Sequence, residues 1–247
     1  MNTFIIGPCS LENYELSYKV LSTVYPYLKD KEFYFKGSFD KANRSSITGQ
    51  RGPGLEEGLE IFKQLKIDFP GLKVTTDVHE TAQVEKLADT IDVIQIPAFL
   101  CRQTDLLVES ARHFNTVNIK KGQWMNPQNM AKGIDKLKVT NPECKVWLTE
   151  RGTAFGYSQF IVDFSSVDFF KEHFDKVIMD CTHAAQLPKP NGRMSGNPTL
   201  AKRYFQAADI FGYTGVFAEA HPTPSLSYSD ADSVLPLEEM VELLKNS

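Results

Sequence analysis

Eight short runs of apolar, β-branched and aromatic residues recur along the 247-residue chain, and longer amphipathic segments separate them. Each run has the length and composition of a strand that is buried on both faces, as the strands of a parallel sheet are. The runs are Thr3–Ile6, Glu32–Phe35, Leu72–Thr76, Val93–Ile96, Val117–Ile119, Val146–Thr149, Val177–Met179 and Gly215–Ala218.

The segments between the runs have helical periodicity. Leu55, Leu59, Phe62 and Leu65 are spaced so that they share one face of a helix. The helices we expect are Asn13–Leu28, Leu55–Phe69, Thr104–His113, Asn129–Leu137, Thr199–Phe211 and Pro236–Lys245. Strands that alternate with helices over this length predict an α/β protein, a (β/α)8 TIM barrel, as one domain over residues 1–247. The alternative is an open doubly wound sheet, which would have to hold eight similar strands in a short chain.

The composition indicates which kinds of molecule the chain can bind. The formal net charge of −4 and the pI of about 5.8 do not favour a nucleic-acid surface, which needs clustered positive charge. No segment approaches the roughly 20 apolar residues of a membrane helix, and MNTFIIGPCS lacks the basic start and apolar core of a secretion signal. The four cysteines form no CxxC pair, so they indicate thiols or metal ligands rather than disulfides. We expect a cytoplasmic protein that binds small molecules.

Polar side chains lie at the end of each of the eight runs or just after it. Because a (β/α)8 barrel carries its chemistry at the carboxyl ends of its strands, these side chains should gather at one mouth. They are Cys9 and Ser10, Lys36, Asp77 and His79, Gln95, Lys120 and Lys121, Glu150 and Arg151, Asp180 and His183, and Glu219 and His221.

A cationic set stands out at this predicted mouth. Like charges brought together repel one another unless an anion binds among them. Arginine binds phosphate through two donors, and lysine binds it as a point charge. The set therefore predicts a polyanionic ligand or two phosphorylated ligands, although each residue could also be a solvated loop charge. Its members are Lys36, Lys41, Arg44, Arg102, Lys120, Lys121 and Arg151.

A second set consists of a thiol, an imidazole and two carboxylates: Cys9, His183, Glu219 and Asp230. Such donors suit a divalent metal ion of borderline softness. Other roles are open, because Cys9 could be a buried structural thiol, His183 a general base or a phosphate ligand, and the carboxylates a salt bridge. The Gly- and Pro-rich stretch 188–198 has the length of a lid, and it could equally be a plain connection.

Longer motifs resemble those of a known family. The chain contains, in this order, GPCSLEN, KGSFDKANRSS, RGPGLEEGL, TDVHE, IQIPAFLCRQTDLL, KKGQW, ERGTAFGY, DCTHAAQLP and AEAHPTPSLSYSD. Over nearly its whole length it resembles the 3-deoxy-D-manno-octulosonate 8-phosphate synthases. The resemblance implies a homotetrameric (β/α)8 enzyme that condenses phosphoenolpyruvate with arabinose 5-phosphate and water and releases phosphate, a step toward the inner-core sugar of lipopolysaccharide.

The resemblance also implies a metal centre. Synthases of this kind that have a cysteine at the position of Cys9 depend on a divalent ion such as Zn²⁺, Fe²⁺, Mn²⁺ or Co²⁺. The implied ligands are Cys9, His183, Glu219 and Asp230. His183 and Asp230 are also placed to handle protons, and with Lys41 they are the candidate catalytic residues.

The same resemblance assigns the substrate-binding residues. Those matched to phosphoenolpyruvate are Lys36, Lys41, Gln95, Lys121 and Arg151, with Asp77 at the same mouth. Those matched to arabinose 5-phosphate are Asn43, Arg44 and Ser45. Phe99 and Arg102 match a loop that reaches into a neighbouring subunit.

Two other functions compete with this expectation. The KANRSS segment favours arabinose 5-phosphate, whereas the sibling heptulosonate synthases use erythrose 4-phosphate and have a Lys-Pro-Arg-Thr type of segment there. A barrel that binds a sugar phosphate without catalysis is the non-enzyme alternative. The chain also departs from the resembled family at 195–198, where it has Ser-Gly-Asn-Pro instead of the usual Ser-Gly-Gly, and at 224–228.

Overall fold

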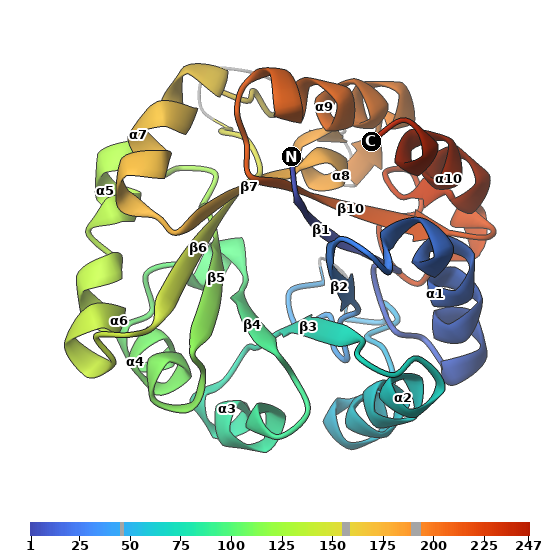
Figure 1. The fold of residues 1–247 in the computed structure, drawn as a ribbon, viewed down its shortest axis with the longest axis horizontal. Helices are drawn as coiled ribbons and strands as arrows, with labels where there is room; N and C mark the ends of the chain where they lie inside the picture. The colour runs from blue at the N-terminus through green and yellow to red at the C-terminus, as the bar shows by residue number, and fades with distance from the viewer. Residues whose placement is uncertain (45–46, 155–158, 189–193) are drawn as a thin grey trace.

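Parallel strands close on themselves into a barrel with helices around it (Figure 1). The computed structural model describes residues 1–44, 47–154, 159–188 and 194–247, and within them the barrel has eight strands. The last strand pairs with the first and completes the ring. The strands are β1 (Thr3–Gly7), β2 (Glu32–Lys36), β3 (Lys73–Asp77), β4 (Val93–Ile96), β5 (Thr116–Lys120), β6 (Lys145–Glu150), β7 (Lys176–Asp180) and β10 (Gly215–His221). The predicted barrel and its eight strand runs are confirmed.

The helices lie outside the barrel, one or two after each strand. They are α1 (Tyr14–Leu28), α2 (Leu55–Asp68), α3 (Thr81–Ala88), α4 (Thr104–His113), α5 (Pro127–Ala131), α6 (Ile134–Thr140), α7 (Val167–His173), α8 (Cys181–Ala184), α9 (Pro198–Ile210) and α10 (Leu237–Lys245). The sequence analysis missed α3, α7 and α8, which are too short to repeat an apolar period several times.

One predicted helix was wrong. The expected helix Asn129–Leu137 is two helices, α5 and α6, with Lys132 and Gly133 between them. Glycine has low helix propensity, and here it sits where one helix ends and the next begins. The predicted loop 188–198 includes β9 (Met194–Gly196), which pairs antiparallel with β8 (Gln186–Pro188). Residues 189–193 of that loop lie outside the described residues, and its action as a lid stays a prediction.

The interior of the barrel is filled by side chains. Ile5, Tyr34, Val93, Trp147, Ile178 and Phe217 form one buried cluster that is separate from the outer core between strands and helices. Tyr34 and Trp147 meet edge to face with ring centroids 5.3 Å apart. Lys176 Nζ lies 4.6 Å from the Trp147 ring. The barrel is therefore closed below its mouth, and the polar side chains at the strand ends rest on an apolar floor.

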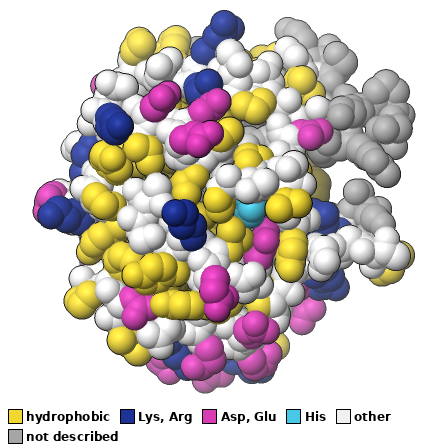
Figure 2. Space-filling model, turned by 90° about the vertical axis from the view of Figure 1, so that its right-hand side faces the viewer, with side chains coloured by type: hydrophobic (Ala, Val, Ile, Leu, Met, Phe, Trp, Pro, Cys, Tyr) yellow, Lys and Arg dark blue, Asp and Glu magenta, His cyan; other side chains and the backbone are white. Residues whose placement is uncertain are grey.

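The outer surface is mixed in character. On the face over α1 and α10, basic, acidic and hydrophobic side chains are interspersed, and Lys and Arg do not gather into one field (Figure 2). This agrees with the net charge of −4 and gives a nucleic acid no basic stripe on this face. Among the described residues, no helix is long and apolar enough to cross a membrane.

Gly7 provides a test of how closely the barrel is packed at the end of β1. A Cβ on Gly7 would lie 1.9 Å from the backbone oxygen of Lys36 on the neighbouring strand. Because that backbone cannot move without breaking the sheet, Gly7→Ala should lower the free energy of unfolding by about 3 kcal/mol or more. Gly133→Ala, in the break between α5 and α6, is the control and should change it by less than about 1 kcal/mol. Urea unfolding measures both, and equal stabilities for the two variants would contradict this packing.

Candidate active site

The carboxyl ends of the barrel strands carry an unusual number of buried charged and polar side chains. Charged groups are rarely buried unless they are paired. The side chains that were predicted at the strand ends and are buried in the structure are Cys9, Ser10, Lys36, Lys41, Asp77, Gln95, Lys120, Lys121, Glu150, Arg151, Asp180, Glu219 and His221. The fold therefore brings most of the predicted set to one mouth, and the pairing of its charges decides what the mouth can bind.

Lys36, at the end of β2, ties three other strand ends together. Its Nζ donates to Ser38 Oγ at 2.8 Å, to the backbone oxygen of Cys9 at 3.3 Å and to Glu219 Oε1 at 3.2 Å. Asp77 Oδ2 lies 3.5 Å away. Burial raises the pKa of Asp77, but Lys36 and Lys41 outweigh it and hold that pKa well below its usual range. Lys36 is thus committed to neutralising two carboxylates of the protein.

Asp180, at the end of β7, orients His183. Its carboxylate caps α8 by accepting from His183 N at 2.9 Å, and its Oδ2 lies 2.9 Å from His183 Nδ1 and 2.8 Å from Lys120 Nζ. Burial works against the negative charge, yet His183 and Lys120 keep the pKa of Asp180 well below its usual range. An imidazole that donates through Nδ1 to a carboxylate presents Nε2 as a ligand or base.

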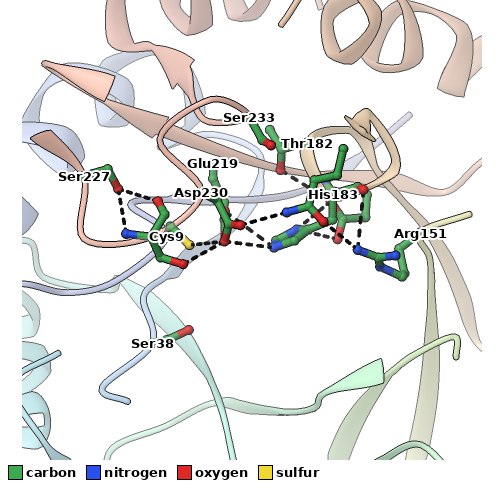
Figure 3. A network of polar contacts seen from close by, with 12 residues as sticks. Cys9, Ser38, Arg151, Thr182, His183, Glu219, Ser227, Asp230 and Ser233 are labelled. Atoms are coloured by element: carbon green, nitrogen blue, oxygen red, sulfur yellow. Dashed lines mark hydrogen bonds and ion pairs between the residues drawn. The ribbon is translucent and has the colours of Figure 1, made fainter. Parts of the chain in front are cut away.

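A thiol, an imidazole and two carboxylates meet beside this pair (Figure 3). One ligand atom each from Cys9, Glu219 and Asp230 lie within 4.8 Å of one another. Cys9 Sγ donates to Asp230 Oδ2 at 3.2 Å. His183 Nε2 is 3.7 Å from Glu219 Oε2 and 4.0 Å from Asp230 Oδ2. The structure thus brings three of the predicted metal ligands, Cys9, Glu219 and Asp230, together, and His183 lies beside the two carboxylates.

These four residues fit a divalent ion. Among the described residues, Glu219 Oε2 is buried and has no hydrogen-bond partner. Burial, and next the Glu219 carboxylate, raise the pKa of the Cys9 thiol well above its usual range. The thiol therefore keeps its proton in the absence of a metal ion, and a bound divalent metal ion would displace that proton. The donors are the sulfur, nitrogen and oxygen ligands that zinc and neighbouring metals accept.

Asp230 is held in a strained conformation. Its φ of 53° is left-handed, which costs a non-glycine residue about 1 kcal/mol. Gln186 Nε2 donates to its Oδ1 at 2.8 Å, and Ser229 Oγ donates to its Oδ2 at 2.9 Å. Such a conformation persists only where the surroundings hold it, so the aim of this carboxylate is set by its neighbours.

A further buried cation, Arg151, has a donor available for an anion. Arg151 Nη2 donates to Gln186 Oε1 at 3.1 Å, and its guanidinium lies 4.5 Å from the Phe160 ring, but its buried Nη1 has no partner among the described residues. The amide of Gln95, fully buried, is likewise unpartnered in the part of the chain that the structure describes. Lys121 is different, because its Nζ donates to the backbone oxygens of Gly122 and Gly152 and to Thr153 Oγ1, and it lies 3.5 Å from Glu150 Oε1. Unmade hydrogen bonds of buried charged donors are costly, and an anionic ligand would satisfy them.

The residues predicted to hold a sugar phosphate follow β2. Lys41 is buried, and although burial opposes its charge, the pKa of Lys41 is raised by Cys9 and by the carboxylates of Glu219, Asp77 and Asp230. Arg44 is partly buried, Asn43 is exposed, and Ser45 lies outside the described residues. Arg44 Nη1 donates to Ser229 Oγ at 2.7 Å, and its Nη2 donates to the backbone oxygen of Tyr228 at 2.9 Å.

Phe99 and Arg102 are not brought into this cluster. Phe99 lies in the short 3-10 turn η1 (Ala98–Leu100), is 56% exposed and stacks on Trp124 with ring centroids 6.2 Å apart. Arg102 follows this turn and is exposed. A role for these two residues at the mouth of their own chain has no support in the structure.

Sequence reasoning missed several residues that shape the site. Asp180 was noted at a strand end, and its spacing of three before His183 is that of a helix cap, which could have revealed its role. Phe217 forms the floor: Lys120 Nζ lies 4.0 Å and Lys36 Nζ 5.4 Å from its ring centroid. Gln186 carried no signal, because its two partners, Arg151 and Asp230, are distant in the sequence.

Comparison with known proteins assigns the chain to a family. The model of the DAHP synthetase I family matches residues 2–247. The chain belongs to the DAHP synthetase I family. Within that family, the chain is 44% identical over 244 residues to the 2-dehydro-3-deoxyphosphooctonate aldolase of Wolinella succinogenes, with 94% of this chain and 92% of the relative covered.

Other relatives carry the same description. The 2-dehydro-3-deoxyphosphooctonate aldolase of Helicobacter hepaticus is 42% identical over 253 residues, which cover 97% of this chain and 93% of that protein. The one from Syntrophotalea carbinolica is 41% identical over 247 residues, which cover 98% and 87%. The similarity to these DAHP synthetase I family members thus extends across the whole barrel and is not limited to a few loops.

Asp180→Asn tests the buried ion pairs through their pH dependence. The folded-state pKa of Asp180 is depressed, so its contribution to stability is present above the unfolded pKa of about 3.9 and is lost as the pH falls below it. The variant leaves Lys120 without its counter-charge and should cost about 3 kcal/mol at pH 7.

Between pH 5 and pH 3 the stability gap between wild type and Asp180→Asn should shrink by about 1 kcal/mol, because only the wild type carries the depressed carboxylate. Urea unfolding at both pH values measures the gap. A gap that stays constant or widens as the solution becomes more acidic would contradict the charged state of Asp180.

Proposed function

We propose that this chain condenses phosphoenolpyruvate with D-arabinose 5-phosphate and water to give 3-deoxy-D-manno-octulosonate 8-phosphate and phosphate. The observation that carries the proposal is one barrel mouth that holds both an unpartnered buried cationic donor, Arg151 Nη1, and a thiol–imidazole–carboxylate cluster. Phosphorylated substrates need the first, and an aldol-type condensation of an aldehyde is assisted by the second. The relatives named 2-dehydro-3-deoxyphosphooctonate aldolase narrow the reaction to this one. It is a step toward the inner-core sugar of lipopolysaccharide.

Phosphoenolpyruvate would bind between β4, β5 and β6. The unpartnered Nη1 of Arg151 and the nearby Lys121 supply positive charge for its phosphate and carboxylate, and the Gln95 amide supplies a neutral donor. Lys36 and Lys121 contribute less than the sequence suggests, because the Nζ of each is already paired with carboxylates of the protein. We therefore assign substrate binding chiefly to Arg151.

The sugar phosphate would enter over the residues after β2. Its phosphate would take the guanidinium of Arg44, and its aldehyde would then lie toward Lys41, between Asp77 and the Cys9 cluster. Asn43 and Ser45 complete this proposed subsite.

In the proposed reaction, C3 of phosphoenolpyruvate forms a bond to the aldehyde carbon, whose oxygen takes a proton. Water adds its oxygen to C2 and loses a proton. The bond between C2 and the phosphate ester oxygen then breaks, phosphate leaves, and the new hydroxyl loses its proton to become the C2 carbonyl. Lys41, which stays charged because anions surround it, is placed to stabilise the alkoxide. His183, oriented by Asp180, and Asp230 are placed to move the protons.

A divalent ion would be held by Cys9, His183, Glu219 and Asp230. When bound, it supplies Lewis acidity toward an oxygen and lowers the pKa of water. Zn²⁺, Fe²⁺, Mn²⁺ and Co²⁺ are all compatible with these donors. All four cysteines of the chain are free, which supports a reducing, cytoplasmic location for a thiolate ligand.

Phosphate release tests the function. The protein should release phosphate from phosphoenolpyruvate when arabinose 5-phosphate is the second substrate, and much less when erythrose 4-phosphate replaces it. A chelator should abolish this release until metal is added back. Faster release with erythrose 4-phosphate would assign the sibling heptulosonate activity instead. Thermal stabilisation by arabinose 5-phosphate without any release would favour a barrel that only binds.

The metal arm of this assay has a matched pair of variants. Cys9→Ser should lower activity at least about tenfold at limiting metal and should weaken metal binding. Cys144→Ser is the control, since Cys144 is equally buried but lies just before β6, away from the mouth. Full activity of Cys9→Ser in chelator would remove the metal role and leave Cys9 a structural thiol.

We also propose that the chain assembles into a homotetramer in which Phe99 and Arg102 reach a neighbouring site. The support is that both are exposed and that Phe99 forms an exposed aromatic pair with Trp124, 42% exposed. Light scattering should return the mass of four 27.9 kDa chains. Arg102→Ala should lower activity without changing Phe99 stacking, and the mass of a single chain at assay concentrations would contradict the assembly.

A further inference from the structure

Glu12, in the loop after β1, makes a long-range contact that the proposed reaction does not use. Its Oε1 accepts from the backbone N–H of Tyr228 at 2.9 Å, across 216 residues of sequence. His221 Nε2 lies 3.7 Å from the same oxygen, and its Nδ1 accepts from Thr223 N at 2.9 Å. Both side chains are almost fully buried, 8% and 5% exposed. A buried carboxylate that bonds to a backbone amide fixes the path of that backbone.

The opposite side of the same peptide unit is also held. Arg44 Nη2 donates to the backbone oxygen of Tyr228 at 2.9 Å, so side chains from the first two strand–helix loops bind both polar backbone groups of Tyr228. Arg44 also restrains the two residues that follow Tyr228. Arg44 Nη1 donates to Ser229 Oγ, and that hydroxyl donates to Asp230 Oδ2 at 2.9 Å. Tyr228 is thereby fixed two residues before a proposed metal ligand.

Backbone strain marks the two ends of this connection. Among the described residues, Glu12 and Asp230 are the only non-glycine residues with positive φ, at 55° and 53°. Each such conformation costs about 1 kcal/mol and persists only where contacts hold it. The Glu12–Tyr228 hydrogen bond lies between the two strained positions, and it is the contact best placed to maintain both.

We infer that Glu12 is a positioning residue that aims Asp230 at the metal centre through the Tyr228 amide. The inference rests on the proposed function, because it presumes that Asp230 is a ligand. What the position requires is an acceptor oxygen that reaches Tyr228 N, more than a negative charge. Removing that acceptor lets the 227–230 backbone relax from the strained conformation and turns the carboxylate away from Cys9 and Glu219.

Co²⁺ binding tests this inference without relying on turnover. The metal-free protein is titrated with Co²⁺, and the near-ultraviolet absorption of the cobalt–thiolate bond and the Kd are recorded for each variant. Glu12→Ala and Glu12→Asp should raise the Kd about 10- to 100-fold, since alanine has no acceptor and aspartate is one methylene too short. Glu12→Gln keeps an oxygen at the same reach and should stay within about threefold of wild type.

Glu32→Ala is the matched control. Glu32 is a partly buried carboxylate at the opposite end of the barrel, where it accepts from Thr3 Oγ1 at 2.8 Å and pairs with Lys176. Its loss should lower stability but leave the Kd for Co²⁺ and the absorption band unchanged. If the Kd rises equally in Glu32→Ala and Glu12→Ala, the effect is general destabilisation and the inference is overturned.

The remaining outcomes separate the inference from the function on which it rests. If Glu12→Ala and Glu12→Asp bind Co²⁺ as wild type does, while Cys9→Ser loses the thiolate band, the metal centre stands and the role of Glu12 is wrong. If Glu12→Gln is as impaired as Glu12→Ala, the hydrogen-bond account is wrong. If wild type itself gives no thiolate band, the proposed metal centre fails and the inference fails with it.

Discussion

The mutual neutralisation of buried charges at the barrel mouth is the interaction on which the rest depends. Lys36 has no exposed surface to solvate it and is stabilised by Glu219 and Asp77, and Asp180 is stabilised by Lys120 and His183. Removing one partner of such a pair leaves an uncompensated charge that costs about 3–5 kcal/mol. The pairs join side chains from different strands, so the barrel must close correctly before any of these charges is tolerated.

What remains after this pairing defines the chemistry. Lys36 and Lys120 lie over the Phe217 ring, and their charges are neutralised by carboxylates of the protein. Arg151, in contrast, has a buried donor that is unpaired among the described residues. The proposed anion site thus lies on the side of the mouth formed by the ends of β5 and β6. On the opposite side, Cys9 after β1, Glu219 on β10 and Asp230 after β10 form the region suited to a cation. One mouth can therefore hold an anionic substrate beside a metal ion.

The fold was more predictable than the site. Strands buried on both faces are nearly continuous apolar runs, so the barrel could be inferred, while short helices such as α3 and the break at Gly133 lacked enough periods to show. Position at a strand end predicted which side chains lie close together. It did not predict which carboxylates pair with Lys36, because those partners are far away in the sequence. Glu12 carried no signal at all, because its partner is the backbone of Tyr228, which no residue type encodes.

Anomalous diffraction from crystals grown with Co²⁺ and phosphoenolpyruvate tests the central claim most directly, since it locates the cation and the anion in one experiment. We expect a single strong cobalt peak bonded to Cys9 Sγ and His183 Nε2, with the substrate phosphate on Arg151. A mouth with phosphoenolpyruvate but no cobalt at Cys9, or cobalt bound only at surface residues, would contradict it.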